Sequence, residues 1–176
     1  MFIEPEVAID SLDVLPGMTA ADFGAGAGFY TMALARRLGD SGKVYAIDIR
    51  QETLEVVRSK AKAEQFSNVE TLWGDLEKPG GSHLQSSSLD IVVVSNILFQ
   101  AADKTAVAGE AARVLRAGGK VMAVEWLPSA PAGLGPAGEH RLTKTEVEAL
   151  FRQSGLNFEK EFDAGEHHFG LIFRKP

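Results

Sequence analysis

Short apolar runs alternate with amphipathic runs of helical period along the whole chain, and this alternation constrains the fold more than any other feature. Apolar runs bounded by turn residues are typical of buried strands, whereas apolar positions three and four residues apart are typical of helices that pack on one side. The expected strands are 19–23, 43–47, 69–73, 89–94, 120–125, 156–162 and 168–174. The expected helices are 29–38, 51–65, 104–115 and 143–154.

Local capping signals support several of these boundaries. Asp103 is an expected N-cap for the helix 104–115, and the glycine pair 118–119 is expected to end it. Thr143 and Glu146 have the spacing of a capping box, in which each side chain caps the backbone of the other residue. These helices are therefore marked by local chemistry as well as by periodicity.

Alternation of strands and helices predicts an α/β fold, a doubly wound open sheet of parallel strands with helices on both faces. The run 89–94 is almost entirely β-branched, which is typical of a central strand covered on both sides. No helix separates the last two strands, so they predict a hairpin in which one strand runs antiparallel to the rest. With 176 residues, the chain is expected to form a single domain over 1–176.

Composition excludes several classes of protein. The chain has no Cys, which excludes disulfide scaffolds, thiolate zinc sites and cysteine nucleophiles. A formal net charge of -6 counts against direct binding of nucleic acid or of an anionic membrane surface. The longest apolar run, 89–99, is shorter than the roughly 20 residues that span a bilayer, and residues 1–10 lack the basic region of a secretory signal. We therefore expect a soluble, cytoplasmic protein.

The segment Asp22-Phe-Gly-Ala-Gly-Ala-Gly28 joins the first expected strand to the first helix. Alternate glycines let the backbone pass close to a ligand, although an ordinary strand-to-helix turn would also explain them. The dinucleotide fingerprint G-x-G-x-x-G requires a glycine at position 29 or 31, where this chain has Phe and Thr. No Gly-Lys-Ser/Thr follows, so the phosphate-binding interpretations are weak.

Polar residues end the next three strands. Asp48 follows the strand 43–47, about 20 residues beyond the glycine turn, where an acid can accept both hydroxyls of a ribose or can cap the next helix. Asp75 follows 69–73 and Asn96 follows 89–94 in the same way. Because the carboxyl ends of parallel strands meet at one edge of the sheet, we expect one ligand site there.

The pattern acid-x-Gly-x-Gly-x-Gly, present as Asp22, Gly24, Gly26 and Gly28, resembles the cofactor motif of the class I S-adenosylmethionine-dependent methyltransferases. The stretch 113–121, Arg-Val-Leu-Arg-Ala-Gly-Gly-Lys-Val, is similar to the turn into the fifth strand of that superfamily, particularly in the ubiquinone/menaquinone-biosynthesis methyltransferase-like branch. The resemblance covers essentially the entire chain. It implies a Rossmann-like, mostly parallel seven-stranded sheet of order 3-2-1-4-5-7-6.

The resemblance also implies S-adenosylmethionine as the cofactor, and a set of residues that bind it. It assigns Asp22 to the methionine ammonium, Asp48 to the ribose, Asp75 with Leu76 to the adenine and Asn96 to the methionine end. Ala25 stands where many members have cysteine, at a position that packs on the cofactor. The full implied set is Asp22, Gly24, Ala25, Gly26, Gly28, Asp48, Ile49, Asp75, Leu76 and Asn96. No metal site is expected, and no catalytic residue is assigned.

Three functional classes remain open. The leading one is methyl transfer to a small or medium-sized organic acceptor; the second is methylation of a protein or RNA with the help of a partner subunit; the third is a non-catalytic cofactor-binding scaffold. The oligomeric state is open as well. Candidate bases and candidate aromatic wall residues are His83, His140, His167 and His168, and Phe29, Trp73, Phe99 and Trp126.

Two loops are rich in small and turn-forming residues, 79–88 and 128–138. The second follows the strand 120–125, so it begins at the ligand-binding edge of the sheet. Its Pro, Gly and Ala residues offer few side chains to bury, which predicts that little packing holds it in one place. We expect it to act either as a lid over the acceptor site or as an inert surface connection.

Overall fold

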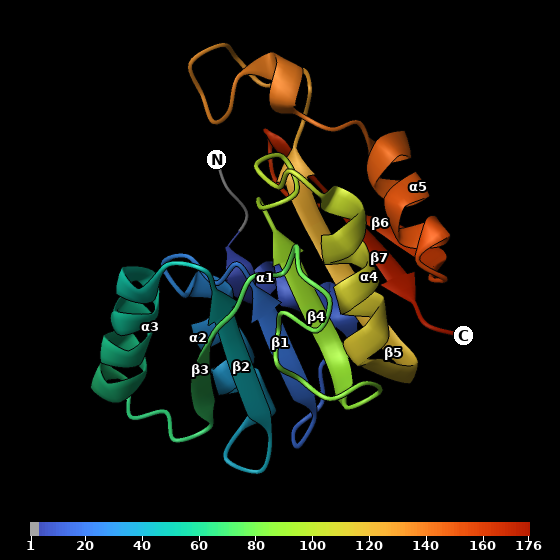
Figure 1. Cartoon of the computed structure of the whole chain (residues 1–176). Helices are drawn as coiled ribbons and strands as arrows, with labels where there is room; N and C mark the ends of the chain where they lie inside the picture. Colours follow the sequence, from blue (N-terminus) through green and yellow to red (C-terminus); the bar gives the residue numbers. More distant parts are fainter. Residues whose placement is uncertain (1–3) are drawn as a thin grey trace.

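A computed structural model describes residues 4–176 and contains one seven-stranded sheet of order β3-β2-β1-β4-β5-β7-β6 (Figure 1). The strands are β1 (Thr19–Phe23), β2 (Lys43–Asp48), β3 (Val69–Trp73), β4 (Leu89–Ser95), β5 (Leu115–Trp126), β6 (Asn157–Asp163) and β7 (His168–Arg174). The pairs among β1 to β5 are parallel, whereas β7 is antiparallel to both β5 and β6. The predicted strand order and antiparallel hairpin are thereby confirmed.

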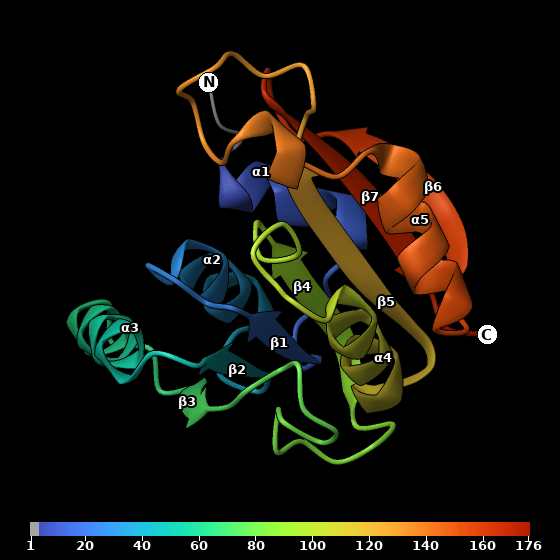
Figure 2. The same ribbon diagram turned by 45° about the horizontal axis from the view of Figure 1, so that its top comes forward.

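Helices cover both faces of this sheet, as the two ribbon views show (Figures 1 and 2). One face carries α1 (Pro5–Ile9), the 3-10 turn η1 (Asp10–Leu12), α2 (Phe29–Leu38) and α3 (Gln51–Ala63). The other face carries α4 (Lys104–Val114) and α5 (Lys144–Gln153), and the 3-10 turn η2 (Gly138–His140) lies in the loop that precedes α5. Over residues 4–176, no helix is long and apolar enough to cross a membrane.

Successive side chains of the central strands enter opposite cores. In β4, Ile91 and Val93 pack with residues of α1 and α2, whereas Val92 and Val94 pack with residues of α4 and α5. This is the pattern expected for a strand covered on both faces. The same alternation continues in β5, where Met122 belongs to the α1–α2 core. Within each of these strands, neighbouring residues at the carboxyl end therefore face opposite sides of the sheet.

The capping predictions are confirmed at both helices. The Asp103 carboxylate accepts a hydrogen bond of 2.9 Å from the Ala106 amide, and Thr143 with Glu146 forms the capping box of α5.

The structure differs from the sequence-based expectation at the start of β5. The glycine pair 118–119 does not end α4, because α4 ends at Val114 and β5 begins at the next residue. Leu115 pairs with Leu89, and the register then shifts before Ile91 pairs with Lys120. Gly118 adopts φ +78° and donates its amide to the Lys175 carbonyl at 2.9 Å. Pairing with strands distant in sequence thus overrides the local stop signal.

The loop between β5 and α5 is folded around one buried arginine. The Arg141 side chain donates to the carbonyl oxygens of Pro128, Ala130, Pro131, Leu134 and Pro136. Gly135 has φ +71°, and a Cβ there would lie 2.5 Å from the Trp126 ring, so the loop backbone rests directly on the indole. This anchor lies outside the stretch 128–138 and contradicts the expectation that little holds the loop in place. Closure of the loop as a lid stays a prediction.

Candidate functional site

Two adjoining cavities lie at the carboxyl ends of the parallel strands, with volumes of about 270 Å³ and 590 Å³. Both are lined by Gly24, Arg50, Ile97 and Gln100. The smaller cavity is also lined by Asp48, Ile49, Asp75 and Leu76, and the larger by Asp22, Ala25, Gly26 and Asn96. Of the residues implied by the resemblance, all but Gly28 line one of these cavities. Gly28 is instead the N-cap of α2, with φ +78°.

The glycine turn brings two backbones into contact. The amides of Gly24 and Ala25 donate to the Ile47 carbonyl at 2.8 and 3.0 Å, so the turn wraps over the end of β2. A Cβ at Gly24 would lie 2.3 Å from Ile97 Cγ2, and the residue has φ +71°. Both observations require glycine at this position.

Asp48 ties the glycine turn to the start of α3. Its carboxylate accepts from the Gly26 amide at 3.1 Å and from the Arg50 amide at 2.9 Å, and only 5% of the residue is exposed. The N-cap of α3 is Arg50, which makes no side-chain capping bond, so the interpretation of Asp48 as that cap is wrong. Its Oδ1 also accepts from Arg50 Nε at 3.4 Å, so the Arg50 side chain forms an ion pair with this carboxylate.

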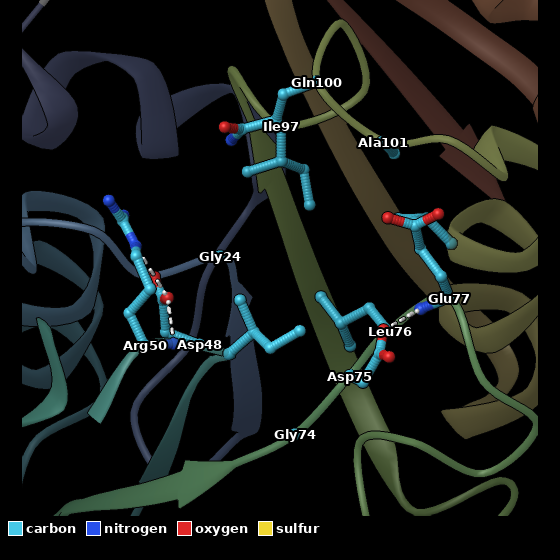
Figure 3. A pocket seen from close by; sticks show the side chains of 12 residues that line it. Gly24, Asp48, Arg50, Gly74, Asp75, Leu76, Glu77, Ile97, Gln100 and Ala101 are labelled. Atoms are coloured by element: carbon cyan, nitrogen blue, oxygen red, sulfur yellow. Dashed lines mark hydrogen bonds and ion pairs between the residues drawn. The ribbon is translucent and has the colours of Figure 1, made fainter.

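The opposite side of the smaller cavity is formed by the segment after β3. Figure 3 shows Asp75, Leu76 and Glu77 across the cavity from Asp48 and Arg50. The Asp75 carboxylate accepts from the Glu77 amide at 3.0 Å, so it stabilises the local turn while also lining the cavity.

Buried oxygen acceptors line the larger cavity. The Asp22 carboxylate accepts from the Thr31 hydroxyl at 2.6 Å, and burial raises the pKa of Asp22 to about 6, with the nearby Asp48 charge acting in the same direction. Asn96 has φ +55°, and its buried Oδ1 has no hydrogen-bond partner among residues 4–176. Unpaired acceptors and buried carboxylates favour a ligand that carries donors or positive charge.

Apolar and aromatic side chains also line the larger cavity. They include Phe29, Tyr30, Val124 and Ala164, and His168 lines it as well. Burial raises the pKa of Tyr30 to about 12 and lowers the pKa of His168 to about 4, so both groups are neutral near pH 7. The His168 ring packs against Trp126 with centroids 4.2 Å apart.

The structure distinguishes among the histidines and aromatic residues named as candidates. His168 lines the larger cavity, whereas His83, His140 and His167 line neither cavity. Phe29 lines the larger cavity and Trp126 packs behind His168, whereas Trp73 and Phe99 line neither.

Sequence reasoning missed several residues around the cavities. Arg50 and Gln100 line both, and Tyr30 lines the larger one. The positions of Arg50 and Gln100, just after the strand-ending polar residues, are the signal that could have identified them. Glu125 lines neither cavity, yet it is buried at the end of β5 and burial raises its pKa to about 7. Among the residues that the structure describes, no group of three or more His, Asp or Glu is arranged to hold a metal ion.

Comparison with known proteins relates this site to one family. A profile described as a methyltransferase domain matches residues 15–154. A demethylmenaquinone methyltransferase of Bacillus mycoides is 34% identical over 115 residues, which are 65% of this chain and 47% of the relative. The chain thus spans about half the length of that curated relative.

Solved structures with the same fold include a SAM dependent methyltransferase from Aquifex aeolicus, with a TM-score of 0.88 and 25% identity over 98% of this chain and 89% of that one. A second fold neighbour was solved in complex with the Trm112 methyltransferase activator of Haloferax volcanii. It has a TM-score of 0.80 and 18% identity, over 98% of this chain and 89% of that one.

Proposed function

This chain belongs to the class I S-adenosylmethionine-dependent methyltransferases, and we propose that it transfers a methyl group from S-adenosylmethionine to a small or medium-sized, largely apolar organic acceptor. The observation that carries this proposal is the cavity of about 590 Å³, whose lining combines the buried Asp22 carboxyl and the amide of Asn96 with the side chains of Phe29, Tyr30 and Val124. Such a mixed lining suits a ligand end that carries donors and positive charge together with an apolar acceptor.

In this proposal the smaller cavity holds the adenosine. Asp48 accepts from the ribose hydroxyls, while Asp75 and the Leu76 amide meet the edge of the adenine. The backbone from Gly24 to Gly28 packs along the cofactor, and Ile49 covers the adenine side. Support comes from the burial of Asp48 and from its position across the cavity from Asp75 (Figure 3).

The methionine end occupies the larger cavity beside Asp22, Ala25 and Asn96. Two features support this placement: Asn96 Oδ1 is a buried oxygen without a hydrogen-bond partner among the described residues, and Asp22 is a buried carboxyl. An ammonium would supply both the donors and the charge that this pair lacks. The same pair would repel a pyrophosphate, which counts against a dinucleotide.

S-adenosylmethionine supplies, when bound, an electrophilic methyl group that a nucleophile attacks in line with the departing sulfur. The residues of this chain orient the two reactants and exclude water. The neutral His168 imidazole lines the larger cavity, and with a pKa of about 4 it is a weak base.

The bacterial relatives named for demethylmenaquinone methylation support an apolar carbocyclic acceptor. The second candidate is a macromolecular acceptor recognised with a partner. It is favoured by the exposed apolar side chains of Phe29, Ile49 and Trp73 and by the activator complex of the archaeal neighbour. A non-catalytic scaffold is the third candidate, and no observation of the site favours it.

Two measurements test the proposal. Calorimetric titration is expected to show saturable binding of S-adenosylhomocysteine and none of NADH, whereas binding of NADH alone would refute the cofactor. In the second measurement, methyl-labelled S-adenosylmethionine is incubated with the protein and a short-chain demethylmenaquinol, and separately with total RNA and protein. Label that enters the organic extract supports the small acceptor, whereas label found only in acid-precipitable material supports the macromolecular candidate.

A further inference from the structure

Glu125 is a buried carboxyl that the proposed reaction does not use. It is the second-to-last residue of β5, it is 1% exposed, and it lines neither cavity. Side chains alternate along β5, so Glu125 lies on the same face as Val121 and Ala123, which pack with α4 and α5. Val124 beside it lies on the opposite face, with α1 and α2, and lines the larger cavity. Burying a carboxyl group costs free energy unless other groups hydrogen-bond to it. The groups that contact Glu125 therefore indicate its role.

Those partners belong to the turn that follows β4. Glu125 Oε1 accepts from the Leu98 amide at 2.8 Å, and the Asn96 amide donates to the Val124 carbonyl at 2.8 Å. Two consecutive residues of β5 therefore hold the turn 96–100. The second oxygen, Oε2, is buried without a hydrogen-bond partner among residues 4–176, and Lys104 is the cation whose charge acts on the carboxyl.

The position of this turn fixes the junction of the two cavities. Ile97 and Gln100 line both cavities, and Asn96 lines the larger one. Ile97 also packs so closely on the glycine turn that no Cβ fits at Gly24. A displacement of the turn by a fraction of an ångström would therefore change both the cavity junction and the place of the Asn96 oxygen.

We propose that Glu125 is a positioning residue for the cofactor, because it holds the turn 96–100 in the place where Asn96 and Ile97 meet the ligand. The inference rests on the proposed cofactor site and does not depend on the identity of the acceptor. Glu125 acts through the Leu98 amide and touches no reactant.

A purely structural role would give a different result. A carboxyl that only stabilises the fold would change the free energy of unfolding and leave the affinity of the folded protein for the cofactor unchanged. A positioning residue changes that affinity beyond what lost stability explains, and a variant that keeps the acceptor oxygen restores it.

The experiment measures the affinity for S-adenosylhomocysteine by titration calorimetry, and the stability by urea unfolding. Glu125→Gln keeps an acceptor oxygen for the Leu98 amide, whereas Glu125→Met removes it and Glu125→Asp shortens the side chain by one methylene. Val147→Ala is the matched control, because Val147 is fully buried on α5 and lines neither cavity.

We expect the Gln variant to bind within about threefold of wild type, and the Met and Asp variants to bind about tenfold more weakly, which corresponds to about 1.4 kcal/mol. The control should lose stability and keep its affinity. Met and Asp variants that bind as wild type does would overturn the inference, as would a control weakened equally. If the Met variant does not fold, the Asp and Gln pair decides alone. Failure of the wild type to bind S-adenosylhomocysteine would contradict the proposed function and this inference together, whereas equal binding by all variants contradicts only the inference.

Discussion

Replacing Asp48 by Asn tests whether this carboxylate recognises a ribose. The substitution keeps the shape of the side chain and one acceptor oxygen, but it removes the charge and turns the second oxygen into a donor. In the structure Oδ2 accepts from the Gly26 amide and Oδ1 accepts from the Arg50 amide and Nε, so the Asn variant keeps the bonds to only one of the two oxygens. We therefore expect a loss of about 1.5–3 kcal/mol in the free energy of unfolding, the range for one hydrogen bond to a charged group.

The effect of the substitution on cofactor binding can be measured separately from this loss of stability, by comparing two ligands that differ only in the ribose hydroxyls. Two ribose hydroxyls donating to Asp48 would together contribute at least about 3 kcal/mol, so wild type should prefer S-adenosylhomocysteine over its 2′,3′-dideoxy analogue by roughly a hundredfold. In the Asn variant this preference should fall below about tenfold, because an amide nitrogen cannot accept from a hydroxyl. The affinity for the dideoxy analogue should change little.

The assay is calorimetric titration of both ligands into both proteins, at a temperature where urea unfolding shows each to be folded. Comparing two ligands within each protein cancels any general distortion of the glycine turn. If both proteins show the same preference between the two ligands, Asp48 does not recognise the ribose and only ties the turn to α3.

Three further predictions follow from local geometry. Gly24→Ala should destabilise the protein by about 2–4 kcal/mol through its positive φ and its contact with Ile97, and the added substitution Ile97→Ala should recover part of that loss in urea unfolding. Burial raises the pKa of Glu125 from 4.5 to about 7, so the fold favours its neutral form, and the resulting stabilisation is complete below pH 4.5 and is lost as the pH rises through 7. The difference in unfolding free energy between wild type and Glu125→Gln should therefore change by about 3 kcal/mol between pH 4.5 and pH 8, and a difference independent of pH would contradict it. Arg141→Met should increase hydrogen exchange across 128–136 while α5 stays protected, because it removes the donors to the loop carbonyls, and unchanged exchange would show that the loop is held by other contacts.

Much of the fold could be predicted because its signals are local. The β-branched run of β4, the cap at Asp103 and the capping box at Thr143 each act within a few residues, and the structure confirms them. The strand-ending polar residues Asp48 and Asp75 could be assigned to one edge by topology alone, since parallel strands bring their carboxyl ends together.

Other features depend on contacts between residues far apart in the sequence, so the local pattern could not predict them. The glycine pair 118–119 lies within β5 because that strand pairs with residues distant in sequence, and Asp48 ties a turn more than 20 residues upstream to α3. Arg141 holds a loop whose own composition shows no anchor. Glu125 meets the turn 96–100 only because two neighbouring strands end side by side. The seven strands, the helices α2 to α5 and the edge that carries the polar residues could be predicted from the sequence, because they depend on periodicity and on strand direction. The division into two cavities required the packed structure, because it depends on which side chains meet across strands.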